Sequence, residues 1–270
     1  MSEKVVLVGC GNMGRAMLEG WLKTGRLQPK DVAVVEPADA LRRKAADLGC
    51  KAVPASTDLA PGGEPALVIF AVKPQVIREV VAEYKSYAGG RTAFLSVAAG
   101  TRIATFEEIL GSGVPVIRCM PNTPAAIGKG MMVVVGNGKV SADLMTFVTD
   151  LLAASGEVTT IGDESLMDAV TAVSGSGPAY IFHFIECLTA AGRTAGLPED
   201  TAALLAMQTV YGAACLAAES REDPAVLRRQ VTSPNGTTAA ALEVLMGGDR
   251  LKSLLTEAVE AARRRSVELG

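Results

Sequence analysis

The 270-residue chain has few aromatic residues, few charges and a single histidine. Aromatic side chains make up 4% of the residues and charged ones 20%, against 49% hydrophobic residues. This balance excludes an intrinsically disordered chain. The net charge is −3, and no basic run is longer than Arg263–Arg265. A nucleic acid or an anionic membrane is therefore not an expected partner.

Cysteine is also sparse, with five scattered residues and no C-x-x-C pair. This pattern excludes a disulfide framework, predicts no metal site, and is typical of small core residues in a reducing compartment. The apolar run near the N-terminus has only the length of a strand, so it is not a signal peptide. No apolar run approaches the ~20 residues that span a bilayer. We therefore expect a soluble, cytoplasmic protein.

A glycine-rich turn stands at the start of the chain, between the apolar run Lys4–Val8 and an amphipathic stretch that reaches Lys23. Its sequence is Gly9-Cys10-Gly11-Asn12-Met13-Gly14. In a G-x-G-x-x-G turn the first glycine permits the tight turn, the second lets the backbone approach a pyrophosphate, and the third lets helix and strand pack closely. The helix N-terminus then faces the phosphates. The pattern predicts a dinucleotide site; the alternative is a turn that serves packing alone.

Short apolar runs and helical segments alternate from this turn to Ile161, and the runs are apolar on both faces. Such alternation predicts an α/β domain with a doubly wound, mostly parallel sheet over residues 1–163. From Glu164 onward no strand-like run appears, and residues 166–270 contain 20 alanines. We expect an all-α domain over residues 164–270 that packs against a second copy of itself.

Glu36 follows the second predicted strand, Val32–Val35. A carboxylate at this position can accept hydrogen bonds from both ribose hydroxyls of the adenosine, and its charge repels a 2′-phosphate. This favours NADH over NADPH, although Arg42 and Arg43 in the next helix could still attract a 2′-phosphate. The alternative is a solvated strand end.

Two proline-containing segments follow predicted parallel strands: Ala71-Val72-Lys73-Pro74 and Cys119–Pro124, which includes Met120, Pro121 and Asn122. Ligands of open α/β sheets bind at the carboxyl edge of the strands. Both segments are therefore candidates for the nicotinamide side of the site, while prolines that simply end the strands are the alternative.

The polar segment Arg229–Ala240 contains a Pro-Asn-Gly turn that leads into another predicted helix. Ser233, Gly236, Thr237 and Thr238 surround the start of that helix and together could bind a carboxylate through backbone N–H groups and hydroxyls. A threonine that only caps the helix is the alternative. His183 lies on a predicted buried helix, where a packed or interface role is commoner than a catalytic one.

Six motifs taken together resemble the pyrroline-5-carboxylate reductase family, in order and over essentially the whole chain. They are the segments 9–14, 71–74, 96–100, 120–124, 174–180 and 231–238. The resemblance implies a Rossmann domain followed by a helical dimerisation domain, and reduction of 1-pyrroline-5-carboxylate to L-proline by NADH or NADPH, the last step of proline biosynthesis. It also implies dimers, which in many members of the family assemble into a decamer.

The resemblance also implies roles for individual residues. Residues 9–14 would hold the pyrophosphate, whereas residues 71–74 and 120–122 would line the nicotinamide. Ser233, Gly236, Thr237 and Thr238 would bind the substrate carboxylate, with Thr238 near the ring nitrogen as the catalytic residue. The chain departs from the family at Gly14, where alanine is usual, and at Asn235, where glycine is usual and a left-handed backbone is expected. Glu36 also replaces a small polar residue that suits a 2′-phosphate.

Two other classes of function remain as alternatives. A related imine or hydroxyacid oxidoreductase would share the architecture, but hydroxyacid enzymes place a lysine in the first helix after the dinucleotide domain, and no lysine occurs between Glu164 and Leu251. A non-catalytic nicotinamide-binding sensor would keep the fold and lose the 231–238 segment, which is intact here.

Overall fold

The computed structural model describes residues 4–59 and 63–270, which form two compact units. The first unit runs to Ser176 and also includes Ala262–Gly270, and the second is Gly177–Ala261. The domain boundary predicted at residue 163 follows the last strand. The division by contacts falls later because Met167 is buried in the core of the first unit and Ser174 accepts hydrogen bonds from Asn122.

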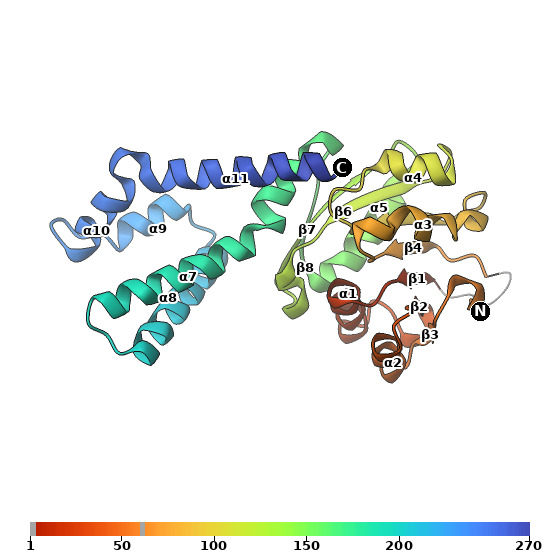
Figure 1. Ribbon diagram of the computed structural model, residues 1–270, viewed down its shortest axis with the longest axis horizontal. Coiled ribbons are helices and arrows are strands. Elements are labelled where there is room, and N and C mark those ends of the chain that lie inside the picture. Colours follow the sequence, from red (N-terminus) through yellow and green to blue (C-terminus); the bar gives the residue numbers. More distant parts are fainter. Residues whose placement is uncertain (1–3, 60–62) are drawn as a thin grey trace. The chain divides into compact units, whose positions relative to one another are not determined.

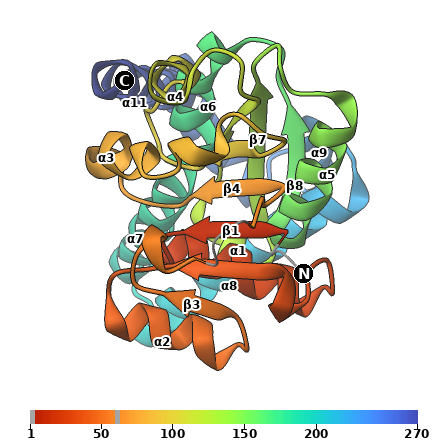
Figure 2. The same cartoon turned by 90° about the vertical axis from the view of Figure 1, so that its right-hand side faces the viewer.

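The first unit is built on an eight-stranded sheet with the order β3-β2-β1-β4-β5-β6-β7-β8, as Figure 2 shows for the first part of the sheet. All neighbouring strands are parallel except β6 and β7, so the predicted doubly wound, mostly parallel sheet is confirmed. The strands are β1 Val5–Val8, β2 Val32–Val35, β3 Lys51–Val53, β4 Leu67–Phe70, β5 Ala93–Ser96, β6 Val116–Met120, β7 Gly130–Gly136 and β8 Gly156–Thr160.

Helices cover both faces of this sheet. Alternate strand residues point to opposite faces, which is why β1, β2, β4 and β5 are apolar at almost every position and buried on both sides. One core cluster joins the strands to α1, α2 and α5, and the other joins them to α3, α4 and α6. These helices are α1 Asn12–Lys23, α2 Asp39–Asp47, α3 Ile77–Ala82, α4 Ile103–Leu110, α5 Ala142–Leu152 and α6 Met167–Val170.

Beyond Thr160, the described chain is helical, as the sequence predicts. A single π-helical turn, η8 (Thr171–Gly175), follows α6 and leads into the second unit (Figure 1). The helices from there on are α7 Gly177–Thr194, α8 Glu199–Ser220, α9 Pro224–Gln230, α10 Thr237–Met246 and α11 Arg250–Leu269, the last of which ends in the first unit.

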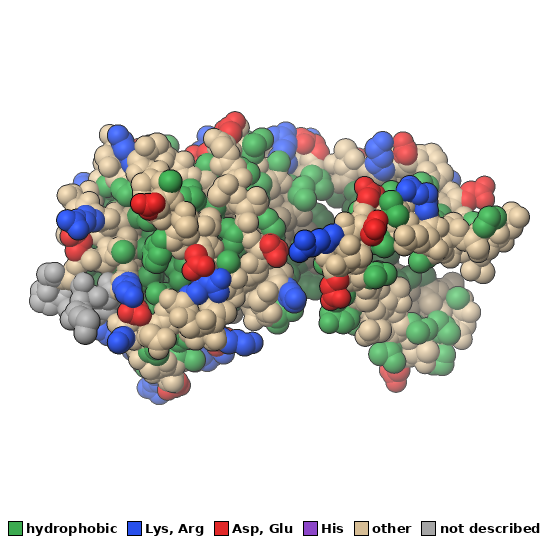
Figure 3. All heavy atoms as spheres, turned by 180° about the vertical axis from the view of Figure 1, so that it is seen from behind, with side chains coloured by type: hydrophobic (Ala, Val, Ile, Leu, Met, Phe, Trp, Pro, Cys, Tyr) green, Lys and Arg blue, Asp and Glu red, His purple; other side chains and the backbone are tan. Residues whose placement is uncertain are grey.

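The second unit exposes many large apolar side chains on its surface (Figure 3). α7 has no buried residue, so the prediction that His183 lies on a buried helix is wrong for the single chain. By length and composition α8 could cross a membrane, although the sequence contains no run of about 20 consecutive apolar residues. Polar residues such as Gln208 and Thr209 interrupt its apolar run, which hides it from a count of consecutive apolar residues. One such helix is weak evidence for a membrane.

Candidate active site

The glycine-rich turn lies where the strand order of the sheet reverses. β1 pairs with β2 on one side and with β4 on the other, so the carboxyl ends of β1 and β4 meet at the switch point where open α/β sheets bind ligands. Gly9 follows β1 with φ +90°, and its N–H donates to the Val35 carbonyl oxygen at 2.8 Å. A Cβ on Gly9 would lie 2.7 Å from the carbonyl oxygen of Ala71, which follows β4. The two predicted segments therefore meet, and only glycine fits between them.

The second glycine of the turn faces open space. Nothing lies within 4 Å of the position that a Cβ on Gly11 would take, and Gly11 is the N-cap of α1 without a side-chain cap. The first N–H groups of α1 are thus left to a ligand, as a pyrophosphate requires. A cavity of about 510 Å³ begins here. It is lined by Asn12, Met13, Arg15, Ala16, Glu19, Thr123 and Ala126.

The third glycine permits close packing. A Cβ on Gly14 would overlap the carbonyl oxygen of Gly9 and would lie 3.2 Å from the Cβ of Ala71. Together the three glycines fit a bound dinucleotide: one makes the turn, one leaves room for the phosphates, and one brings the helix to the strand.

Sequence analysis missed several residues of this cavity. Arg15 and Glu19 lie on one face of α1 and form an ion pair of 2.6 Å, while Ala126 comes from η5 (Thr123–Ile127). Thr123, which also lines the cavity, was already part of the predicted segment Cys119–Pro124. The spacing of four residues between Arg15 and Glu19 could have predicted this ion pair from the sequence, because residues at i and i+4 lie on one face of a helix. The approach of η5 to α1 is a long-range contact that no local pattern reveals.

The carboxylate of Glu36 is buried and already holds two backbone N–H groups. Its Oε2 accepts from Cys10 N–H at 2.7 Å, and its Oε1 accepts from Ala38 N–H at 2.9 Å. The side chain thereby ties the end of β2 to the glycine-rich turn. Each carboxylate oxygen has a second lone pair, so the predicted bonds to ribose hydroxyls stay possible in this arrangement.

The two nearby arginines are both engaged with acceptors. Arg42 donates to the carbonyl oxygens of Glu36 and Pro37 at 3.1 and 3.0 Å and to the Asp39 carboxylate at 2.7 Å. Arg43 pairs with the other Asp39 oxygen at 2.7 Å. A 2′-phosphate would therefore have to compete with Asp39 for either guanidinium.

The segments after β4 and β6 emerge from the same edge of the sheet, because β4, β5 and β6 are parallel. Ala71 and Val72 contact the glycine-rich turn, whereas Lys73 is exposed and precedes the short helix that begins at Pro74. Met120, the last residue of β6, reaches η8, where its Cε would overlap a Cβ on Gly175.

The side-chain amide of Asn122 is hydrogen-bonded within the protein. Its Oδ1 accepts from Met131 N–H at 2.8 Å, and its Nδ2 donates to the Ser174 carbonyl oxygen at 3.2 Å. Pro121 beside it is buried. The amide therefore joins the segment after β6 to β7 and η8.

The 233–238 segment forms the start of α10. Asn235 has φ +59°, which confirms the expected left-handed backbone, and Gly236 N–H donates to the Ser233 carbonyl oxygen at 3.1 Å. Gly236 is the N-cap and no side chain caps the helix, so neither Thr237 nor Thr238 has the capping role considered as the alternative. The free N–H groups, together with two threonine hydroxyls, suit a carboxylate.

The titratable groups at the glycine-rich turn and the chain's one histidine offer little acid–base chemistry. Burial, and then the charge of Glu36, raises the pKa of Cys10 to about 11, so it stays a neutral thiol. His183 is on an exposed face of α7, where its Nδ1 lies 3.0 Å from the Glu186 carboxylate. Within residues 4–59 and 63–270, no cluster of three or more His, Cys, Asp or Glu side chains could hold a metal ion.

Comparisons with known proteins agree with this architecture. Residues 4–100 match the family described as NADP oxidoreductase, coenzyme F420-dependent, and residues 164–269 match pyrroline-5-carboxylate reductase dimerisation. The chain is 40% identical to a pyrroline-5-carboxylate reductase of Synechocystis over 280 aligned residues, which covers 100% of this chain and 99% of the relative.

Solved structures give the same result. A pyrroline-5-carboxylate reductase from Coxiella burnetii superposes with a TM-score of 0.93 at 32% identity, over 100% of this chain and 99% of that one. The Plasmodium falciparum pyrroline carboxylate reductase, solved with NADP bound, has a TM-score of 0.84 at 29% identity over 99% and 98% of the two chains. Fold, site and full-length similarity coincide, and the chain belongs to the pyrroline-5-carboxylate reductase family.

Proposed function

We propose that this protein reduces 1-pyrroline-5-carboxylate to L-proline by hydride transfer from NAD(P)H, the last step of proline biosynthesis. The observation that carries the proposal is the complete glycine-rich turn at the β1/β4 switch point in a chain that is similar over its full length to reductases of this name. The test is to follow oxidation of NADH and of NADPH separately with purified protein and 1-pyrroline-5-carboxylate, and to identify proline as the product. The absence of turnover with both dinucleotides would reject it.

The substrate carboxylate is proposed to bind the 233–238 segment. The uncapped N-terminus of α10 supplies backbone N–H groups and a positive dipole end, and Ser233, Thr237 and Thr238 supply hydroxyls. Gly236 suits this place because a Cβ there would overlap the Ser233 Oγ.

The reaction needs little acid–base help, because an iminium carbon is already electrophilic. The bound reduced nicotinamide supplies the hydride. What the chain must do is hold the imine carbon close to it and fix the ring face. Thr238 is proposed to hydrogen-bond the ring nitrogen and to pass it a proton where one is needed.

We propose that NADH is the preferred dinucleotide. Glu36 places a buried negative charge beside the turn, and Arg42 and Arg43 are both paired with Asp39. A 2′-phosphate would meet the carboxylate without a free guanidinium to offset it.

Glu36→Gln tests this preference. The amide keeps an oxygen that can accept one of the two backbone N–H groups and removes the charge, so we expect the NADH/NADPH ratio of kcat/KM to fall about tenfold, which corresponds to ~1.4 kcal/mol. Glu79→Gln, which neutralises an exposed carboxylate on α3, is the matched control and should leave the ratio unchanged. An unchanged ratio in Glu36→Gln would mean that this residue does not discriminate between the dinucleotides.

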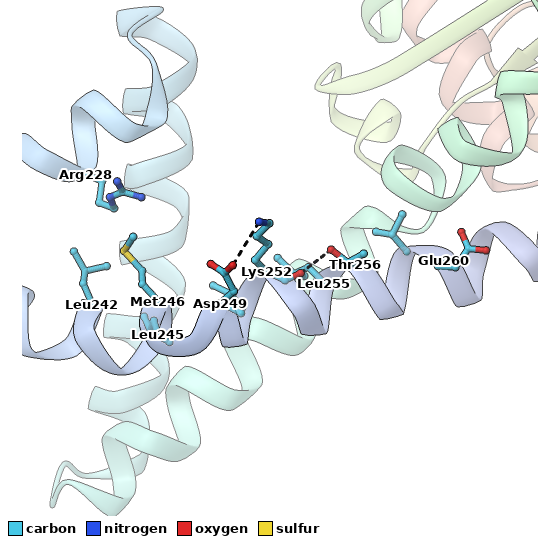
Figure 4. Close-up of a pocket in the computed structure, with 11 residues that line it drawn as sticks. Arg228, Leu242, Leu245, Met246, Asp249, Lys252, Leu255, Thr256 and Glu260 are labelled. Carbon is cyan, nitrogen blue, oxygen red and sulfur yellow. Dashed lines mark hydrogen bonds and ion pairs between the residues drawn. The ribbon is translucent and has the colours of Figure 1, made fainter.

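The helical unit is proposed to self-associate as a dimer, with a decamer as the larger assembly that the family suggests. The dimerisation match over residues 164–269 supports this, as do the exposed apolar side chains of α7 and α8. An apolar groove of about 780 Å³ lies in the same unit, between α9, α10 and α11 (Figure 4). Its apolar wall includes Leu242, Leu245, Met246 and Leu255, and an Asp249–Lys252 ion pair of 3.6 Å lies at its rim.

Leu204→Glu tests the assembly. Leu204 is 67% exposed in the single chain, so the substitution should leave the fold of one chain intact. A charge buried in a dimer interface is costly, and we expect the dimer to dissociate and activity to fall with the dimer fraction. The measurements are sedimentation velocity and turnover over a concentration series. Ala104→Glu, which adds the same charge to an exposed position on α4, should preserve both, whereas an intact dimer in Leu204→Glu would remove α8 from the interface.

The cellular location is proposed to be the cytoplasm. The five cysteines are free, and three of them are buried as thiols, which suits a reducing compartment.

A further inference from the structure

A second, polar cavity lies in the first unit, away from the glycine-rich turn. Its volume is about 310 Å³, at the lower end of the range for small-molecule sites. Its walls come from the start of α4, the middle of β6, η7 (Glu164–Leu166), α6 and the final turns of α11, which lies beside α4 and α6 in Figure 2. The lining residues are Arg102, Arg118, Glu164, Ser165, Asp168, Arg263 and Val267.

Three guanidinium groups converge on this cavity against two carboxylates. Both carboxylates already accept hydrogen bonds from the protein. Glu164 Oε1 accepts from Ile103 N–H at 2.8 Å and pairs with Arg118 Nη1 at 3.1 Å, and Asp168 Oδ1 accepts from the Ser266 hydroxyl at 2.6 Å. Counted over the lining side chains alone, positive charges exceed negative ones by one, and Arg263 also interacts with another group of the protein.

Arg118 is the most buried of the three arginines and would contribute most to the affinity of the cavity for an anion. It is 4% exposed, on a central strand, so its charge is largely withdrawn from water. A buried charge is stabilised by pairing and by further hydrogen bonds, and one contact to Glu164 uses a small part of the five N–H donors of a guanidinium. Planar guanidinium donors match the oxygens of carboxylates and phosphates.

The cavity is also linked to the carboxyl edge of the sheet. Arg102 ends the β5–α4 segment, which contains Gly100 with φ +75°. Leu269 of α11 packs on Gly100, with its carbonyl oxygen 3.3 Å from the place of a Cβ there. The Arg102 Nε lies 3.4 Å from the place of a Cβ on Gly270, so Arg102 forms the rim next to the end of α11.

We propose that this cavity is a binding site for a small oxyanion, separate from the dinucleotide and substrate sites. Arg118 forms its floor, Arg102 and Arg263 form its rim, and the Ser165 hydroxyl is a further donor. Binding joins the end of α11 to α4 and stabilises the first unit.

Inorganic phosphate is the probe. With the dinucleotide turn occupied by saturating NAD⁺, and with ionic strength matched by sodium chloride, phosphate at ten times its Kd should raise the melting temperature by roughly 3–5 °C. Arg102→Gln and Arg263→Gln should each weaken binding about tenfold in titration calorimetry, while Arg102→Lys, which keeps the charge, should lose less. Arg78→Gln is the matched control, because it removes an exposed arginine whose partner is Glu108, outside the cavity.

Equal phosphate binding in the wild type, Arg102→Gln and Arg263→Gln would overturn the proposal, as would the absence of binding to the wild type. Each variant is first checked for an unchanged melting temperature without phosphate and an unchanged Kd for NAD⁺, so that a folding defect is not mistaken for loss of the site. Because the readout is phosphate binding rather than turnover, a failure here is distinguishable from a failure of the proposed reductase activity.

Discussion

Thr238→Ala should lower kcat for 1-pyrroline-5-carboxylate by about 100-fold and leave the Kd for NADH unchanged. The expected size is that of one proton-transfer or hydrogen-bonding group at the reacting atoms. Thr238 is the second residue of α10, so its hydroxyl stands at the uncapped helix end proposed to bind the carboxylate. The measurements are steady-state kinetics and a fluorescence titration of NADH.

Thr238→Ser is the matched variant, because serine keeps the hydroxyl and removes the methyl group. It should retain kcat within a few-fold of the wild type. If Thr238→Ala also keeps its kcat within a few-fold, Thr238 has no part in the chemical step. If it raises only the KM for the imine, the hydroxyl binds the substrate without stabilising the transition state.

Gly11→Ala should weaken NADH binding by about tenfold or more without destabilising the protein. The backbone at Gly11 has φ −67°, which alanine adopts without strain, and the added methyl group meets nothing within 4 Å. Removing glycine flexibility at such a position stabilises a fold by ~0.4–1 kcal/mol. The same methyl group would occupy the space through which the pyrophosphate approaches the backbone. The charge-assisted hydrogen bonds between the pyrophosphate and the backbone N–H groups would then be weakened or lost.

Gly9→Ala provides the contrast. At φ +90°, with the carbonyl oxygen of Ala71 2.7 Å from the new Cβ, it should lose both stability and NADH affinity. Gly25→Ala, at φ +71° in open space, should lose some stability and no affinity. Thermal melts and NADH titrations of the three variants separate these effects. Unchanged NADH affinity in Gly11→Ala would place the pyrophosphate away from this turn.

The features that could be predicted from sequence are those that depend on local periodicity. Apolar runs separated by helical segments predict the sheet and its parallel strands, and the strand Val32–Val35 has the predicted bounds. The left-handed backbone at Asn235 was also predictable, because asparagine is one of the few residues that tolerate it. In each case neighbouring residues decide the conformation.

The contacts of Glu36, Asn122 and His183 were harder to predict from the sequence. Sequence places Glu36 at a strand end, yet which N–H groups its carboxylate accepts depends on how closely β2 approaches the glycine-rich turn. The side chain of Asn122 joins Met131 to Ser174, which is 52 residues away from Asn122 in sequence, and no local pattern predicts these bonds. His183 was expected on a buried helix, whereas α7 has no buried residue in the single chain.

By itself, the sequence determined the fold class, the dinucleotide turn and the family, because periodicity, glycine spacing and motif order are properties of short segments and of their succession. Only the tertiary structure decided which donors and acceptors were already paired, that the space beside Gly11 is open, and that Arg102, Arg118 and Arg263 line one cavity. These facts depend on the approach of segments far apart in the chain, which strand pairing and helix packing fix and no local pattern records.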